Sequence, residues 1–178
     1  MSPPLSDLAQ VVHGNGDFSS KLISLVDRNP GEVLAKIEGT ISASQRAYTS
    51  VQVSEDADIE LNSDLVFCNH SCSPSVLFDM ANVEVRVAGD KPLKKGEDVT
   101  FFYPSTEWDM EQPFQCGCGS QKCIGVVQGA KYLDESVLKQ YWLNSHIDHL
   151  LSKRKASDAS GHLPKQTIVD DAARKLKN

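Results

Sequence analysis

Residues able to bind a metal or act as nucleophiles concentrate in two short stretches of this 178-residue chain. The first, FCNHSC, spans residues 67–72 and contains two cysteines, a histidine and an asparagine. The second, CGCGSQKC, spans residues 116–123 and contains three more cysteines. Thiolates and imidazoles are the ligands that zinc prefers, and a structural zinc ion takes four of them in a tetrahedron. The two stretches together therefore favour a metal site.

The second stretch supplies three of the four ligands that such a site needs. They are Cys116, Cys118 and Cys123. Gly117 and Gly119 leave room for the backbone to fold tightly around an ion, so alanine at these positions should impair folding if that room is needed. The fourth ligand must come from elsewhere in the chain. The candidates in the first stretch are Cys68, His70 and Cys72.

Two other interpretations of these residues compete with a metal site. The chain has five cysteines, and an odd number fits a disulfide framework poorly, but three unrelated free thiols would explain the second stretch without any site. Cys68 and His70 share one face of an extended segment, so a thiolate–imidazole nucleophile is geometrically possible. No neighbouring residue supplies an orienting third group or an oxyanion hole. Metal binding remains the leading hypothesis.

The elements around these stretches are short strands up to about residue 130. Strands are expected at residues 33–37, 48–53, 65–68, 83–87 and 99–103. Val83, Val85 and Val87 alternate with charged residues, which is typical of a half-buried strand, and Pro104 ends the last of these runs. The pattern predicts a mostly β (α+β) domain of short strands.

Helical character appears late in the chain. Asp134 is a suitable N-cap, and the apolar spacing that follows predicts one helix over residues 134–151. Residues 152–178 are polar and basic, which predicts a flexible tail.

Composition and charge limit the partners. The net charge is −6, and because residues 152–178 carry seven Lys/Arg and three Asp (+4), residues 1–151 carry −10. An acidic body repels phosphate, which argues against direct nucleic-acid binding and favours a cationic partner such as a lysine-rich peptide. There is no apolar run of about 20 residues to cross a membrane and no secretory leader pattern. We therefore expect a cytoplasmic or nuclear protein that is not secreted.

Four blocks of the chain, in order, resemble the SET-domain methyltransferases that carry a zinc-binding post-SET segment. The blocks are Gly14-Asn15-Gly16, Asn69-His70-Ser71-Cys72-Ser73-Pro74, the strand from Gly96 to Tyr103, and Cys116-x-Cys118-x4-Cys123. The resemblance implies a compact SET-type β-clip fold with a knot-like core. It implies a SET domain at residues 11–110 and a post-SET segment at residues 111–130.

The same resemblance assigns roles to residues of this chain. It implies that Asn69 and His70 contact S-adenosylmethionine, and that the backbone of Gly14, Asn15 and Gly16 binds the methionine end of that cofactor. Tyr103 corresponds to the catalytic tyrosine of the family and also lies at the cofactor. The implied zinc ligands are Cys72, Cys116, Cys118 and Cys123.

The implied activity is S-adenosylmethionine-dependent methylation of a lysine amine in a protein or peptide. Methylation of a small metabolite, and a SET fold kept only to bind the cofactor or a peptide, are the alternatives. Three positions depart from the usual family pattern: Val66 stands in place of Arg, Ser75 in place of Asn, and Phe102 in place of Asp. None of them removes an implied zinc ligand or Tyr103, so the departures bear on the substrate more than on the fold.

Overall fold

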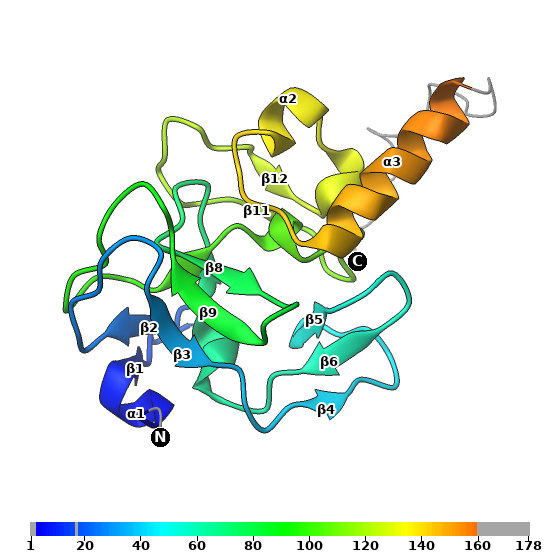
Figure 1. Ribbon diagram of the computed structural model, residues 1–178. Coiled ribbons are helices and arrows are strands. Elements are labelled where there is room, and N and C mark those ends of the chain that lie inside the picture. The colour runs from blue at the N-terminus through cyan, green and yellow to red at the C-terminus, as the bar shows by residue number, and fades with distance from the viewer. Residues whose placement is uncertain (1–2, 17, 160–178) are drawn as a thin grey trace.

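The computed structural model describes residues 3–16 and 18–159, and within them short strands form five small sheets (Figure 1). The first strands are β1 (Ala9–Val12), β2 (Lys21–Ser24), β3 (Val33–Lys36), β4 (Ile41–Ser42), β5 (Ser50–Gln52) and β6 (Asp58–Glu60). The later strands are β7 (Asn69–His70), β8 (Val76–Asp79), β9 (Glu84–Val87), β10 (Thr100–Phe101), β11 (Phe114–Gln115) and β12 (Val126–Val127). The predicted mostly β, α+β class is confirmed.

The helices are few, and most of them are short. The α-helices are α1 (Leu5–Leu8), α2 (Glu135–Leu138) and α3 (Ser145–Ala159). The 3-10 helices are η1 (Asp64–Phe67), η2 (Tyr103–Ser105) and η3 (Ala130–Tyr132). Figure 1 shows α2 and α3, together with β11 and β12, on one side of the other strands. No described helix is long and apolar enough to cross a bilayer.

The sheets combine local hairpins with long-range pairs. β1 and β2 form an antiparallel hairpin, and β11 pairs antiparallel with β12. β3, β9 and β8 form one antiparallel sheet, and β4, β6 and β5 form another. β7 and β10 run parallel, which brings two stretches about thirty residues apart into direct contact. This last pair contains Asn69 and His70, and Tyr103 follows β10 by two residues.

Apolar side chains from the strands fill the main core. Val85 and Val87 of β9 are fully buried, and Phe78 of β8 stacks on Phe101 of β10 with ring centroids 4.1 Å apart. Each side chain of this size stabilises the fold by about 1.5–3 kcal/mol when it is removed from water. The predicted alternation holds over residues 85–87, but Glu84 is buried as well, and Val83 lies before the strand and is exposed.

Two predicted strands differ from the structure near the site. In place of the strand expected at residues 65–68, Asp64–Phe67 form η1, because the backbone N–H groups of Val66 and Cys68 turn back to carbonyls three residues earlier. The predicted strand at residues 99–103 reaches only Phe101. Pro104 has no N–H to donate to a sheet and fits the first turn of a helix, so η2 begins at Tyr103.

The predicted helix over residues 134–151 is wrong, because two helices, α2 and α3, are separated by residues 139–144. The carbonyl of Asn144 accepts the first N–H bonds of α3 while its side chain bonds to the core, so the chain restarts the helix there. α3 continues to Ala159, eight residues into the predicted tail. Residues 160–178 lie outside the described residues.

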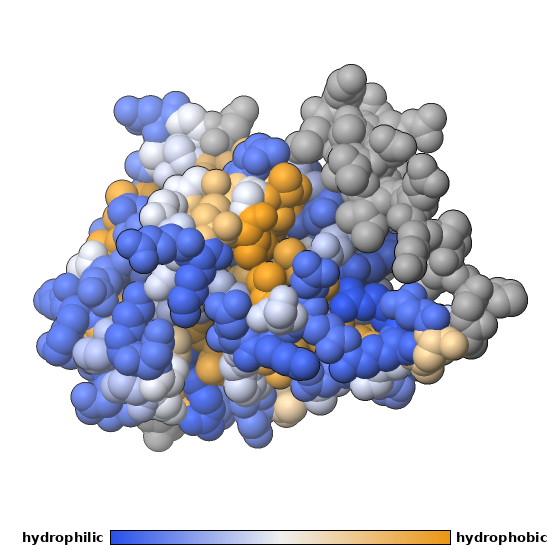
Figure 2. All heavy atoms as spheres, turned by 90° about the horizontal axis from the view of Figure 1, so that it is seen from above, coloured by the Kyte–Doolittle hydropathy of each residue, from blue (hydrophilic) through white to orange (hydrophobic). Residues whose placement is uncertain are grey.

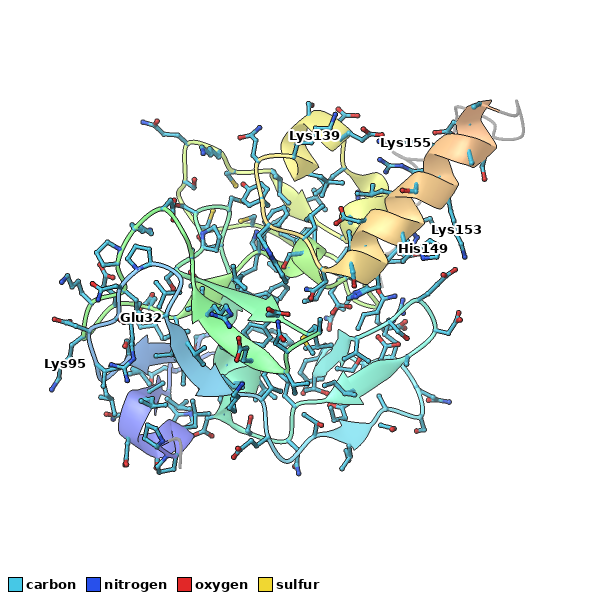
Figure 3. All side chains as sticks on the ribbon, viewed as in Figure 1. Glu32, Lys95, Lys139, His149, Lys153 and Lys155 are labelled. Atoms are coloured by element: carbon cyan, nitrogen blue, oxygen red, sulfur yellow. The ribbon has the colours of Figure 1, made fainter. Side chains whose placement is uncertain are left out.

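Ion pairs hold α3 to the body of the protein. Lys153 pairs with Glu55, and Lys155 pairs with Glu135 of α2 at 2.9 Å. Figure 3 shows both lysines projecting from α3. Seen from above in Figure 2, hydrophilic side chains cover most of the described surface and border a central apolar band.

Candidate functional site

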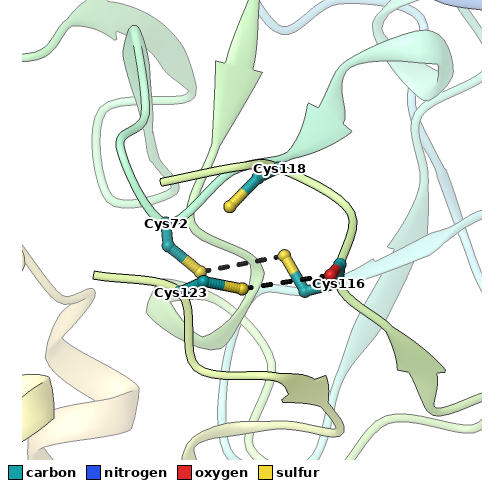
Figure 4. Close-up of side chains that lie close together, drawn as sticks. All are labelled: Cys72, Cys116, Cys118 and Cys123. Carbon is teal, nitrogen blue, oxygen red and sulfur yellow. Dashed lines mark hydrogen bonds between the residues drawn. The ribbon is translucent and has the colours of Figure 1, made fainter. Parts of the chain in front are cut away.

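Four cysteines from two distant parts of the chain converge at one point. The Sγ atoms of Cys72, Cys116, Cys118 and Cys123 all lie within 4.8 Å of one another (Figure 4). The Sγ atoms of Cys72 and Cys116 are 3.9 Å apart. Zinc–sulfur bonds of about 2.3 Å in a tetrahedron place the sulfurs about 3.8 Å apart. The cluster could therefore hold a metal ion.

The hairpin of β11 and β12 presents three of these thiols. The backbone N–H of Cys116 donates to the carbonyl of Gly125 at 2.7 Å, which closes the loop between the two strands. Gly119 has a φ of +66°, in the left-handed region that favours glycine. Gly117 has no positive φ, and a Cβ at this position would meet no atom within 4 Å among the described residues. The expectation that both glycines are needed is therefore wrong for Gly117.

The thiols of the cluster differ in how readily they ionise. Burial raises the pKa of Cys72 to about 11. Burial also tends to raise the pKa of Cys118, but N–H groups of Cys72 and Ser120 facing its sulfur outweigh this and bring the pKa to about 7. At neutral pH the thiol of Cys118 is therefore already partly ionised. A cation placed among the four sulfurs would stabilise the remaining thiolates.

The side chain of His70 points inward, toward the cysteines. Its Nδ1 accepts the backbone N–H of Tyr103 at 3.2 Å, so in the neutral ring the proton sits on Nε2, which lies 3.3 Å from the Sγ of Cys72. Burial lowers the pKa of His70 to about 4, which keeps the ring neutral. His70 thus hydrogen-bonds a cysteine of the cluster and the backbone at Tyr103 at the same time.

The alternative of a Cys68–His70 nucleophile is contradicted by this geometry. The thiol of Cys68 is buried and donates to the carbonyl of Val99 at 3.2 Å. Burial raises the pKa of that thiol far above its usual range. Both nitrogens of His70 already have other partners, so the pair has neither a thiolate nor a base.

Tyr103 contacts His70 through its backbone and through its ring. Its hydroxyl donates to the carbonyl of Cys68 at 3.1 Å, and burial raises its pKa above the usual range. Its ring packs edge-on against His70, with centroids 5.4 Å apart, and also contacts Phe101 and Phe114. Aromatic rings thus pack around the ring of this tyrosine.

A polar hollow of about 430 Å³ opens beside β7, within the size range of small-molecule sites. Its lining includes Asn69 and His70 of β7, Lys21 of β2, and the backbone at residues 117–118 of the cysteine loop. Lys21 is paired with Asp98, another lining residue, at 2.7 Å. The hollow therefore adjoins both predicted motifs.

The Gly14–Gly16 turn stands next to this hollow but does not line it in the described residues. The link is indirect: the side chain of Asn69 donates to the carbonyl of Ser20 at 2.9 Å, at the exit of the turn. A Cβ on Gly14 would lie only 2.2 Å from the hydroxyl of Ser19, which explains why this position is occupied by glycine. The structure thus brings Asn69, His70 and Tyr103 together and leaves the turn at the margin.

Sequence reasoning missed a buried carboxylate that closes one sheet edge near Tyr103. Glu107 accepts the backbone N–H of Gln52 at 2.9 Å, on the outer edge of β5. Its own backbone N–H donates to the carbonyl of Tyr103 at 3.0 Å. Burial raises the pKa of Glu107 to about 7. No local sequence signal marks this contact, because a glutamate in a loop is ordinarily exposed.

It also missed two residues of the linker between α2 and α3. Tyr141 stacks on Phe102, and Asn144 bonds to three backbone groups of the core. Tyr141 fits the apolar spacing expected of a continuous helix, which hid its role. The groups that Asn144 bonds are far away in the sequence, so no local signal marks it.

Comparisons with known proteins identify the family of the chain. No protein-family model matches the chain. It is 48% identical over 157 residues to methyltransferase flvH of Aspergillus flavus, covering 88% of each protein. Over 96 residues, 51% of this chain, it is 29% identical to the H3 lysine-36-specific histone-lysine N-methyltransferase of Saccharomyces cerevisiae, and that match spans 13% of the yeast enzyme. The chain belongs to the family of methyltransferases that includes methyltransferase flvH.

Proposed function

We propose that this chain is a SET-type, S-adenosylmethionine-dependent protein-lysine N-methyltransferase stabilised by zinc. The observation that carries the proposal is a continuous chain of contacts between the candidate catalytic and metal-binding groups. Tyr103 bonds through its backbone to His70, His70 contacts the Sγ of Cys72, and Cys72 lies in the four-thiol cluster. An isolated tyrosine or cysteine cluster would carry much less weight than this connected arrangement.

Zinc is the metal that best suits four thiol ligands at this spacing. Cys72, Cys116, Cys118 and Cys123 would hold it and thereby fasten the β11–β12 hairpin to β7. His70 would support the site from outside by donating to one ligand, since hydrogen bonds from neighbouring residues orient the ligands of a metal. The role proposed for this ion is structural.

The polar hollow beside β7 is the proposed place for the cofactor, with Asn69, His70 and the Gly14–Asn15–Gly16 turn at its border. When bound, S-adenosylmethionine supplies an electrophilic sulfonium methyl whose S–C bond breaks as an N–C bond to the acceptor amine forms. Lys21 and Asp98 give this hollow one charge of each sign, suited to the charged methionine end of such a molecule.

Tyr103 would position the acceptor amine. Its ring packs against the rings of His70, Phe101 and Phe114, and its hydroxyl bonds to the carbonyl of Cys68. A lysine amine with an ordinary pKa of about 10.4 must be neutral to react, and desolvation lowers that pKa. The displaced proton leaves to solvent before the amine is held in line. Alignment of this kind contributes several kcal/mol to catalysis.

A protein substrate is supported by the acidic body of the chain and by the name of the yeast relative. One observation favours a small amine instead. Peptides commonly bind by adding a strand to a free sheet edge. The N–H of Gln52 on the edge of β5 is already taken by Glu107, next to Tyr103. A small acceptor needs no such edge, so methylation of a small amine is the second candidate function.

The test follows labelled methyl groups from S-adenosylmethionine in a cell extract and in separate reactions with a lysine-containing peptide and with free small amines. The Tyr103→Phe variant is the loss-of-function control. Tyr132→Phe is the matched control, since that hydroxyl bonds to Asp109 rather than to a group of the candidate site. Label on protein or peptide, lost in Tyr103→Phe alone, supports the first function. Label only on small amines supports the second, and cofactor binding without transfer refutes both.

A further inference from the structure

One side chain of the linker between α2 and α3 reaches both halves of the site. The ring of Tyr141 stacks on the ring of Phe102, with centroids 3.7 Å apart and planes within 5° of parallel. Its hydroxyl donates to the backbone carbonyl of Cys72 at 2.8 Å. Phe102 directly precedes Tyr103, and Cys72 belongs to the thiol cluster. A single residue from the C-terminal part therefore contacts the neighbour of Tyr103 and the backbone of one cysteine of the cluster.

Tyr141 is itself held firmly at both ends of its segment. Leu138, which ends α2, is buried, and its carbonyl accepts the backbone N–H of Tyr141 at 3.0 Å. Three residues later, the side chain of Asn144 bonds to the carbonyls of Phe78 and Ser105. A tyrosine fixed on both sides can transmit position to its partners rather than merely fill space.

The stack also accounts for one departure of the sequence from the family pattern. Phe102 stands where an aspartate is usual, and it is almost wholly buried against Tyr141 and the ring of His70. A carboxylate at that position could not stack on Tyr141 and would lie buried without a partner charge. The aromatic residue at 102 and the tyrosine at 141 thus form a matched pair.

We propose that Tyr141 is a positioning residue, which places Tyr103 through Phe102 and places the metal cluster through the carbonyl of Cys72. The inference rests on the proposed function and deepens it. The two contacts are separable. Phenylalanine at 141 keeps the stack and loses the hydroxyl, whereas leucine loses both.

The experiment compares Tyr141→Phe, Tyr141→Leu and the control Trp142→Leu. Trp142 is the next residue and is 42% exposed, so its change is the same aromatic-to-leucine substitution outside the stack. Two readouts are measured on the zinc-loaded 178-residue chain. They are the rate at which a chelator removes the metal, and kcat and KM for methyl transfer to the acceptor found in the preceding test.

Tyr141→Phe should release the metal roughly threefold to tenfold faster, the value of one hydrogen bond, while kcat stays within about twofold. Tyr141→Leu should also lose roughly tenfold in kcat with little change in KM for the cofactor, because an aromatic pair is lost beside Tyr103. Trp142→Leu should leave both readouts within about twofold of wild type. A kcat near the wild-type value in Tyr141→Phe, together with a lowered kcat in Tyr141→Leu, would distinguish loss of the ring stack from a general loss of fold.

Equal metal release by wild type and Tyr141→Phe, or equal loss of kcat in Tyr141→Leu and Trp142→Leu, overturns the inference. If Tyr141→Leu does not fold, Tyr141→Phe still decides through metal release. If the wild type transfers no methyl group, the proposed function fails while the metal readout still tests Tyr141. If the wild type holds no metal, the metal arm of the inference is refuted.

Discussion

Asn144 offers the sharpest test of how the C-terminal part supports the site. β8 is the outer strand of its sheet, and the side-chain amide of Asn144 caps its free edge much as a neighbouring strand would. The amide oxygen accepts the N–H of Met80 at 2.9 Å, and the amide nitrogen donates to the carbonyl of Phe78 at 2.9 Å. Asn144 is 2% exposed, so water cannot replace these bonds in the folded chain.

Asn144→Ala leaves two buried backbone groups, at residues 78 and 80, without partners. The carbonyl of Ser105 is spared, because the backbone N–H of Asn144 still donates to it at 3.0 Å. An orphaned buried donor or acceptor costs about 1–3 kcal/mol, so with two of them the free energy of unfolding should fall by about 2–6 kcal/mol. That is a large share of the roughly 5–15 kcal/mol typical of a domain.

The assay is urea unfolding followed by tryptophan fluorescence at equal protein concentration, with the slope of the transition checked between variants. Asn29→Ala is the matched control. Its amide makes one exposed bond to Glu32, so its loss should stay below about 1 kcal/mol. A loss under about 1 kcal/mol for Asn144→Ala would refute the view that this amide completes the edge of β8.

Three other predictions concern charge, metal and backbone. Burial raises the pKa of Glu107 to about 7, so the stability that its protonated form contributes is full below about pH 4.5 and is lost as the pH rises through 7. Between pH 5 and pH 8 the free energy of unfolding of Glu107→Gln should therefore rise relative to that of the wild type, by up to about 3 kcal/mol. Urea unfolding at each pH measures this difference. Cys118→Ser should release bound zinc and lower Tm, and metal analysis with thermal melting would show a fully loaded variant if the cluster is not the site. Gly119→Ala should lower the free energy of unfolding by about 1–2 kcal/mol because φ is positive there, whereas Gly117→Ala should leave it nearly unchanged. Equal unfolding midpoints for the two variants would count against this interpretation.

Much of the chemistry was already determined by the sequence. The thiol-rich loop is recognisable because side-chain type and short spacing are local properties, whereas Asn69, His70 and Tyr103 were singled out by the resemblance to SET-domain methyltransferases. Strands β3 and β9 were predictable for the same reason, since a short run of β-forming residues predicts the first and the alternation of valine with charged residues predicts the second. The mostly β class followed from such local signals.

Tertiary structure decided how these pieces meet. The parallel pairing of β7 with β10 sets His70 beside Phe101 and so brings it to Tyr103, and no local pattern encodes that register. The fourth cysteine of the cluster was likewise decided by folding, because the candidates Cys68, His70 and Cys72 are equivalent in sequence. In the structure the thiol of Cys68 lies in the core and that of Cys72 lies in the cluster.

The break between α2 and α3 was also a tertiary outcome. The apolar spacing after Asp134 fits a continuous helix, but Asn144 satisfies the edge of β8 and Tyr141 stacks on Phe102, and these contacts outweigh the few helical bonds given up. Sequence determined which groups are available for chemistry, because that depends on residue type. Packing decided which of them face one another, because burial and hydrogen-bond satisfaction are properties of the whole chain.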